Sequence, residues 1–319
     1  MKNIFVKDLC ENMAFIDFFM VKSSNIREGA NKKEYLDLTL GDMTGEVNAK
    51  KWDIQPIEKS TLDHINDGDI VKVKAQTNVW QGNIQLKVEK IRLANETDGV
   101  EIESFVKAAP EKPEEMYNYL MDVAQNMVDE DFRKVSTEIL ERNKEELMYY
   151  PAASKNHHAE LGGLLYHMKR MVMSGIALCN IYTFLNRDLV LTGVIIHDME
   201  KIREIMSNEY GVSPGYSMEG QLLGHIVQGV RELDKLTESL GIPREKAIML
   251  EHMILSHHYE PEYGSPKKPM FAEAEMLHYL DVLDARMFDM EEIQEPVPAG
   301  GFSERVWTLD NRKLYKPTF

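Results

Sequence analysis

The spacing of apolar residues changes near residue 95, and this change constrains the fold more than any other feature of the chain. Before it, apolar side chains occupy every second position in segments such as 35–40, 71–76 and 84–89, which is the period of half-buried strands. After it, apolar side chains recur at intervals of three and four, as in 116–127, which is the period of a helix. The pattern therefore predicts a strand unit followed by a helical unit.

Glycine-containing turns at 41–45 and 80–83 separate the expected strands. Several short antiparallel strands in so few residues favour a closed five-stranded β-barrel. The tail beyond the last helix is too apolar to stay in solvent, so we expect it to pack on a domain or on a neighbouring subunit. The chain then divides into a barrel domain, a linker, an all-α helical bundle and a C-terminal tail, over 1–95, 96–112, 113–292 and 293–319.

Composition places the chain among ordinary globular proteins, with 319 residues, 43% of them apolar and 28% charged. Its two cysteines, Cys10 and Cys179, are far apart, which argues against a disulfide framework and for a reducing compartment. The first residues are too polar for a signal peptide, and no apolar run approaches the roughly 18 residues of a membrane span. We therefore expect a cytoplasmic protein without a membrane partner.

The formal net charge of −16 is unevenly distributed. Basic and acidic residues balance in 1–95, so the helical part carries the whole acidic excess. Because lysine and arginine drive non-specific binding to phosphates, the neutral N-terminal part is better suited to nucleic acid than the total charge implies. Bound divalent cations would also invert the local potential of an acidic site.

Imidazoles and carboxylates stand inside the apolar helical stretches, in the order His, His-Asp, His, His, Asp. Both groups are common ligands of divalent metals, and one aspartate can bridge two ions about 3.5–4 Å apart. Helices packed around one core bring such residues to a common centre. Six ligands are enough for two ions with open positions left over. The candidates are His167, His197, Asp198, His225, the pair His257 and His258, and Asp281.

The adjacent pair His197 and Asp198 is the strongest of these signals, because it follows the apolar run 190–196. Burying two ionisable groups there costs several kcal/mol unless something compensates, and a metal ion would do so. A lone histidine such as His167 is more often a hydrogen-bonded core residue. Lys201 follows Asp198 by three residues, on the same helix face, so it either pairs with Asp198 or holds a substrate phosphate.

With these motifs, the region 115–292 is similar to the HD-domain metal phosphohydrolases. The resemblance implies four shared metal ligands, two added histidines of the dinuclear subgroup, and an Asp198 that bridges both ions. It favours His257 as the ligand of its pair and leaves His258 for phosphate, although the sequence does not decide between them. His157 and His158 are further candidates for substrate contact. The four shared ligands are His167, His197, Asp198 and Asp281, and the two added ones are His225 and His257.

The run 35–47 resembles the strand, glycine turn and strand of nucleic-acid-binding OB-folds. Counting along the second strand places Trp52 on the same face as Lys50, opposite the apolar positions. An aromatic ring beside a lysine can stack a base, worth about 1–3 kcal/mol. The alternative is that Trp52 only caps the barrel. Trp80, at a hairpin tip, either contacts a ligand or packs against the second domain.

The barrel and HD pairing, together with segments 162–167, 252–258 and 302–307, closely resembles the YhaM-like 3'-5' exoribonucleases. The resemblance implies metal-dependent hydrolysis of single-stranded RNA to 5'-mononucleotides, with single-stranded DNA left open, and a homo-oligomer by analogy. Two divalent ions, Mn2+ by preference and Fe, Co or Ni as alternatives, would be the cofactors. The implied catalytic residues are Asp198, Lys201 and His258, and the implied substrate contacts are Trp52, Lys50 and His158.

Two other functions use part of the same features. An HD-domain hydrolase of a small nucleotide or cyclic dinucleotide would need the metal ligands but not the barrel. A non-catalytic nucleic-acid-binding regulatory protein would need the barrel but not the metal chemistry. Deletion of residues 1–95 should leave a small-nucleotide hydrolase active, whereas an exonuclease should lose affinity for long strands. Bound metal that is lost in Asp198→Ala would separate both enzymes from the non-catalytic protein.

Overall fold

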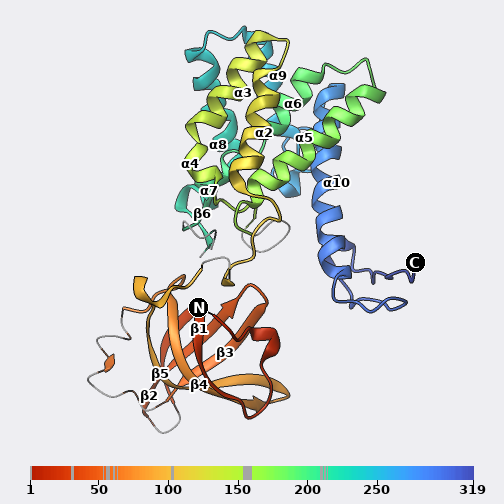
Figure 1. The fold of residues 1–319 in the computed structure, drawn as a ribbon. Coiled ribbons are helices and arrows are strands. Elements are labelled where there is room, and N and C mark those ends of the chain that lie inside the picture. Colours follow the sequence, from red (N-terminus) through yellow and green to blue (C-terminus); the bar gives the residue numbers. More distant parts are fainter. Residues whose placement is uncertain are drawn as a thin grey trace. The chain divides into compact units, whose positions relative to one another are not determined.

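The structure is a computed structural model of the chain. It describes residues 2–29, 32–52, 54, 58, 59, 62, 64–101, 104–153, 160–208, 211, 213 and 215–319. The chain divides into two compact units, Met1–Ala108 and Ala109–Phe319 (Figure 1). The division falls inside the segment 96–112 that we expected to be a linker.

The first unit contains a closed barrel with the strand order β1-β2-β3-β5-β4, and β4 pairs with β1 to close it. Neighbouring strands are antiparallel except β3 and β5, which run parallel. The predicted five-stranded barrel is therefore confirmed within the described part of the unit. Its elements are η1 Val6–Asp8, β1 Ala14–Glu28, β2 Glu34–Asp42, β3 Gly45–Lys51, β4 Ile70–Trp80, β5 Asn83–Leu93 and η2 Glu96–Asp98.

Strand β3 shows how sequence alternation sets the two faces of the barrel. Val47 and Ala49 are buried, whereas Asn48 is exposed and Lys50 is half-buried. Because successive side chains of a strand point to opposite faces, Asn48 and Lys50 lie on the outside. The outer face of β3 is thus polar, as the sequence predicts.

The second unit is a bundle of helices (Figure 1). Helix α6 is its central element. Nine of its ten residues are buried, the exception being Arg187, and Leu191, Val194 and Ile195 are at 0% exposure. It packs against α3, α5, α9 and α10. The elements are α2 Pro113–Gln125, α3 Glu130–Arg142, α4 Lys144–Leu147, α5 Gly163–Ile181, α6 Arg187–Ile196, α7 Lys201–Glu204, β6 Ile205–Met206, β7 Gly215–Tyr216, α8 Met218–Ser239, α9 Arg244–Ser256, η4 Pro261–Tyr263, α10 Ala272–Gln294 and η5 Trp307–Leu309.

The C-terminal tail folds back on the end of α10. A salt bridge joins Arg286 of α10 to Asp310 at 2.6 Å, and Gln294 Nε2 donates to the Tyr315 carbonyl at 3.1 Å. The tail also pairs with itself through the bridge between Phe302 and Tyr315. It therefore packs on the helical unit of its own chain.

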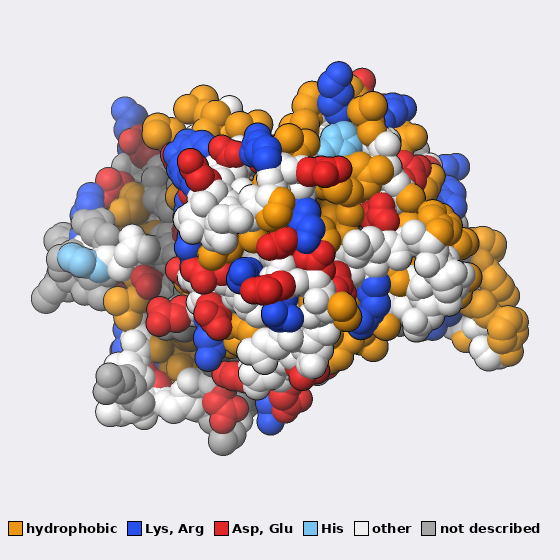
Figure 2. All heavy atoms as spheres, turned by 90° about the horizontal axis from the view of Figure 1, so that it is seen from above, with side chains coloured by type: hydrophobic (Ala, Val, Ile, Leu, Met, Phe, Trp, Pro, Cys, Tyr) orange, Lys and Arg blue, Asp and Glu red, His pale blue; other side chains and the backbone are white. Residues whose placement is uncertain are grey.

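Acidic and basic side chains alternate on the face drawn in Figure 2, rather than gathering into blocks of one sign.

Within the described part of the chain, no helix combines the length and the apolar character that crossing a membrane requires.

Candidate metal centre and nucleic-acid interface

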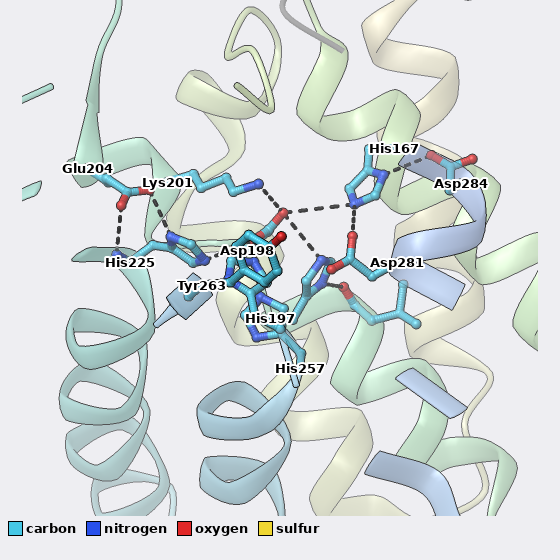
Figure 3. A network of polar contacts seen from close by, with 12 residues as sticks. His167, His197, Asp198, Lys201, Glu204, His225, His257, Tyr263, Asp281 and Asp284 are labelled. Atoms are coloured by element: carbon cyan, nitrogen blue, oxygen red, sulfur yellow. Dashed lines mark hydrogen bonds and ion pairs between the residues drawn. The ribbon is translucent and has the colours of Figure 1, made fainter. Parts of the chain in front are cut away.

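The predicted ligands lie on or at the ends of five helices of the helical unit and come together at one place (Figure 3). His167 lies on α5, His225 on α8 and Asp281 on α10. His197 and His257 each stand at the C-terminal end of a helix, α6 and α9. Residues separated by more than a hundred positions therefore meet, as the sequence predicts. Their ligand atoms form two groups, each within 4.8 Å: His167, His197 and Asp281 in one, and Asp198, His225, His257 and His258 in the other.

Asp198 belongs to the second group and also faces the first, with a different oxygen toward each. Its Oδ2 is 3.3 Å from His197 Nε2 and 3.8 Å from His167 Nε2. Its Oδ1 is 3.4 Å from His225 Nε2 and 3.8 Å from His257 Nε2. This arrangement is the one that a carboxylate shared by two ions requires.

His197 and His257 are oriented by the ends of their own helices. The Nδ1 of His197 lies 2.8 Å from the Val194 carbonyl oxygen, and the Nδ1 of His257 lies 2.7 Å from that of Ile254. The last carbonyls of a helix lack intrahelical partners, so an imidazole N–H placed there satisfies one of them. With Nδ1 donating, the lone pair of each ring is on Nε2, which faces the centre.

Carboxylates orient the other two imidazoles. Asp284 Oδ2 lies 2.8 Å from His167 Nδ1, and Arg170 Nε donates to Asp284 Oδ1 at 2.6 Å. Glu204 Oε2 lies 2.8 Å from His225 Nδ1. Partners of this kind fix the ring and raise the basicity of a metal-ligating histidine.

Asp284 and Glu204 are not among the site residues predicted from the sequence. Asp284 could have been found, because it follows Asp281 by three residues and so shares its helix face. Glu204 follows Lys201 by three residues on α7, but nothing in the sequence pairs it with His225 of another helix.

Gly224 determines how His225 enters the centre. Its backbone has φ 69° and ψ 161°, so α8 is interrupted at this residue. This region of backbone conformation is almost exclusive to glycine. The interruption leaves the His225 N–H to donate to Glu204 Oε1 at 3.2 Å.

Unsatisfied polar atoms show that the centre fits divalent ions. His197 Nε2, His225 Nε2, His257 Nε2 and Asp198 Oδ1 are buried and have no hydrogen-bond partner among the described residues. Ligand atoms about 2.0–2.2 Å from one ion are separated from each other by roughly 3–3.5 Å, close to the spacings around Asp198. Buried polar atoms almost always have a hydrogen-bond partner. A cluster of buried nitrogen and oxygen atoms that carry lone pairs and have no such partner is therefore suited to a metal ion.

The carboxylates of the centre are held in their charged form. Burial would raise the pKa of Asp198, but His197 and Lys201 outweigh it and hold that pKa well below its ordinary value. Burial would also raise the pKa of Asp281, but the hydrogen bond from His167 opposes this effect, and the pKa is lowered. Lys201 Nζ lies 2.6 Å from Asp198 Oδ2, so the ion pair between them is present.

The imidazoles differ in charge. Burial lowers the pKa of His257 well below its ordinary value, and burial also lowers the pKa of His258. For His167, burial is outweighed by Asp281 and Asp284, which raise the pKa to about 9. His257 and His258 can therefore offer a lone pair at neutral pH, whereas His167 must lose a proton before it binds a metal.

His258 stands at the edge of the centre. Its Nδ1 lies 2.6 Å from the Tyr263 carbonyl oxygen, and its ring is half-buried, whereas His257 is at 0% exposure. Both rings belong to the same group of ligand atoms. His157 and His158 lie outside the described residues.

On the barrel, Trp52 forms an aromatic platform with Tyr35. Their rings stack with centroids 4.4 Å apart and an interplanar angle of 28°, and Trp52 remains 44% exposed. Lys50 Nζ lies 5.7 Å from the Trp52 ring centroid. The sequence placed Trp52 beside Lys50 but missed Tyr35, which comes from the neighbouring strand.

Comparison with known proteins agrees with both units. Residues 20–94 match a family model described as an OB-fold nucleic acid binding domain, and residues 164–286 match the HD domain model. Proteins named 3'-5' exoribonuclease YhaM match nearly the whole chain. The one from Geobacillus sp. (strain WCH70) is 41% identical over 95% of this chain and 91% of its own length. Those from Bacillus velezensis and Bacillus subtilis (strain 168) are 41% and 40% identical over 95% of this chain and 94% of their own. The chain therefore belongs to the family of the 3'-5' exoribonuclease YhaM.

Proposed function

We propose that this protein is a metal-dependent 3'-5' exoribonuclease that hydrolyses single-stranded RNA to 5'-mononucleotides. The names of its relatives support the reaction, and the two matched domains support the pairing of a nucleic-acid-binding barrel with a phosphohydrolase centre. The observation that carries the proposal is the set of buried, unpartnered ligand atoms around Asp198.

Two divalent ions are the proposed cofactors. One would be held by His167, His197 and Asp281, the other by His225 and His257, and Asp198 would be shared. Four imidazoles favour a transition ion such as Mn2+, Fe, Co or Ni over Mg2+ alone. When bound, the ions supply Lewis-acid activation of water and neutralise charge on the phosphoryl oxygens.

Lys201 and His258 are the proposed protein groups at the scissile phosphate. Lys201 is charged, because Asp198 and Asp281 outweigh burial and raise its pKa, so its ammonium can donate to a non-bridging oxygen. His258 is neutral and its Nδ1 donates to Tyr263, which leaves Nε2 as a proton acceptor for the attacking water. Water adds to phosphorus, the bond to the 3' oxygen breaks, and that oxygen takes a proton from solvent.

Trp52 and Lys50 are the proposed contacts to the RNA strand on the barrel, with Tyr35 as the second ring of the platform. A base stacked on Trp52 and a phosphate near Lys50 would hold single-stranded nucleic acid without reading its sequence. His158 remains a proposed substrate contact on the sequence resemblance alone.

The test uses single-stranded RNA labelled at the 5' end or at the 3' end, incubated with purified protein and Mn2+. We expect the 5'-labelled RNA to shorten as a ladder and the 3'-labelled RNA to release labelled mononucleotide at once. Products that shorten from the 5' end, or cleavage that persists in a strong chelator, would contradict the proposal. Hydrolysis of a cyclic dinucleotide without hydrolysis of RNA would favour the small-nucleotide alternative.

Asp198→Asn tests the shared carboxylate. We expect the variant to lose bound metal, measured by elemental analysis, and at least 100-fold in cleavage rate, because neither ion keeps a charged ligand from this residue. The matched control is Asp188→Asn, a buried aspartate that accepts from the Val128 and Asp129 N–H groups away from the centre. That control should lower stability and leave the metal content unchanged.

A further inference from the structure

The strand register of the barrel places a row of polar side chains on one outer face. Asn48 of β3 pairs with Gln85 of β5, and Lys50 pairs with Lys87. Because directly paired side chains project from the same face, all four lie beside one another. Trp80 pairs with Asn83 at the end of the β4–β5 hairpin, two positions before Gln85, so the row continues to that hairpin.

An open pocket of about 470 Å3 lies at the hairpin end of this row. Its polar lining consists of one carboxylate and four amides, which come from β3 and from the β4–β5 hairpin. None of the four amides makes a side-chain hydrogen bond within the described part of the chain, and the Trp80 ring at its edge is 62% exposed. The polar lining residues are Glu46, Asn48, Gln81, Asn83 and Gln85.

The pocket is held open by buried contacts. Val6, which lines it, donates its N–H to Asp42 Oδ2 at 2.8 Å. Asp42 also pairs with Lys2 Nζ at 3.0 Å, and both side chains are at most 1% exposed. On the other side, Gln81 and Gly82 have φ of 51° and 83°, the two-residue turn that fixes Trp80 opposite Asn83. A site fixed in this way loses little entropy when it binds a ligand.

The lining indicates which part of a nucleotide the pocket would hold. Amide side chains both donate and accept, which suits the hydrogen-bonding edge of an unpaired base, and Trp80 offers a stacking surface. Glu46 would repel a phosphate, but its carboxylate accepts hydrogen bonds. It can therefore accept from the exocyclic amino group that adenine, cytosine and guanine carry and uracil lacks.

The neighbouring lysines suit the backbone between two bases. Lys50 and Lys87 are paired in register, and the Lys50 ammonium lies 5.4 Å from the Tyr35 ring centroid, so two positive charges stand on this part of the outer face. Trp52 directly follows the last residue of β3 and lies four residues beyond Asn48, about 13 Å at the rise of a strand. The row thus has an aromatic side chain at each end and positive charge in the middle.

We propose that the pocket beside Trp80 binds an unpaired, amino-bearing base of the RNA strand whose other contacts are the Trp52 platform and the two lysines. The proposal rests on the proposed function, and it adds base selectivity to a barrel that would otherwise bind RNA regardless of sequence. The recognising groups are Glu46 and the amides, and Trp80 supplies the stacking.

The experiment measures binding of 5'-fluorescent oligo(A), oligo(C) and oligo(U) to the full chain by anisotropy, with EDTA present to prevent hydrolysis. We expect the wild type to prefer oligo(A) and oligo(C) to oligo(U). Trp80→Ala should weaken oligo(A) and oligo(C) at least about fivefold, the lower end for loss of one stacked base. Trp80→Phe should restore most of the affinity, and Glu46→Gln should reduce the preference over oligo(U).

Two substitutions of exposed apolar residues away from the pocket serve as controls. Trp307→Ala removes another exposed tryptophan, and Ile16→Ala removes an exposed apolar side chain elsewhere on the barrel; neither should change binding. An unchanged affinity in Trp80→Ala would overturn the proposal, and so would a wild type without preference among the three oligonucleotides. Failure of the proposed function is separate, because it would show as absence of 3'-5' cleavage with Mn2+ by the wild-type protein.

Discussion

At the scale of residues, the metal centre depends on carboxylates that would not touch an ion. Glu204 accepts a hydrogen bond from Nδ1 of His225, and Asp284 accepts one from Nδ1 of His167. With Nδ1 donating, the lone pair of each ring is on Nε2. Asp284 is in turn held by Arg170 at 2.6 Å. The orientation of His167 therefore depends on a chain of two further side chains.

We expect Glu204→Gln and Asp284→Asn to weaken metal binding about 10- to 100-fold, the usual cost of losing such a partner. The neutral amide can keep a hydrogen bond but no longer supplies the charge that makes the imidazole basic. Competition with a chelator of known affinity measures the effect without recourse to activity. Glu232→Gln, which changes a carboxylate of α8 paired with Lys235, is the matched control and should bind metal as the wild type does. Equal affinity in all three variants would show that the two carboxylates are only structural.

The residue scale also shows the limit of prediction from sequence. The six proposed ligand positions were recognisable because charged and imidazole side chains in apolar helical runs need a partner. Tyr35 and Glu204 were not recognisable, because each acts through a residue on another element, and the sequence does not state which elements become neighbours.

At the scale of elements, the interruption of α8 is the feature that distinguishes this helix from a regular one. Gly224 stands in an otherwise helical pattern, so an uninterrupted helix was the natural interpretation of the sequence. In the structure its φ of 69° redirects the chain immediately before His225. The proposed ligand His225 therefore lies at a break in α8, whereas His197 and His257 lie at the C-terminal ends of α6 and α9.

We expect Gly224→Ala to destabilise the helical unit by about 1–3 kcal/mol, the cost of a strained backbone conformation, and to reduce metal affinity by moving His225. Thermal unfolding and chelator competition give the two quantities. Gly241→Ala places a side chain at another positive φ, 66°, in the same unit and away from the ligands. We expect Gly241→Ala to lower the stability of the unit without changing its metal affinity. If both variants bind metal equally well, the break does not position His225.

At the scale of the whole molecule, the order of the two units and the closed barrel were predictable, whereas the pairing of β3 with β5 was not. Alternating residues in β2, β4 and β5 identified strands, and the spacing in α2 identified a helix, because both periods are local. The parallel pairing of β3 with β5 joins residues such as Asn48 and Gln85 that no local pattern connects. The row of polar side chains that follows from this register was therefore visible only in the structure.

Removing metal should affect the two units unequally. Without ions, the centre contains like-charged carboxylates, Asp198 and Asp281, and unsatisfied imidazoles in a buried site. A ligand that binds only the folded state stabilises it by mass action, about 2.7 kcal/mol at a hundredfold excess over its Kd. We expect EDTA to lower the melting temperature of the helical unit, followed by its helical circular dichroism, and Mn2+ to restore it. The barrel, followed by Trp52 and Trp80 fluorescence in a Trp307→Phe variant, should melt as before. A shared shift of both transitions would contradict this expectation.

The attachment of His197 and His257 to their own helix ends has a further consequence. Each ring is hydrogen-bonded to a carbonyl three residues earlier in its own helix. The position of the ring is therefore fixed by the helix and not by a loop. Any substitution that slides α6 against α9, even several turns away, would alter the separation of the two rings. With Co2+ in both proposed ion sites, one containing each ring, the absorption spectrum would then report how well the distant interior is packed.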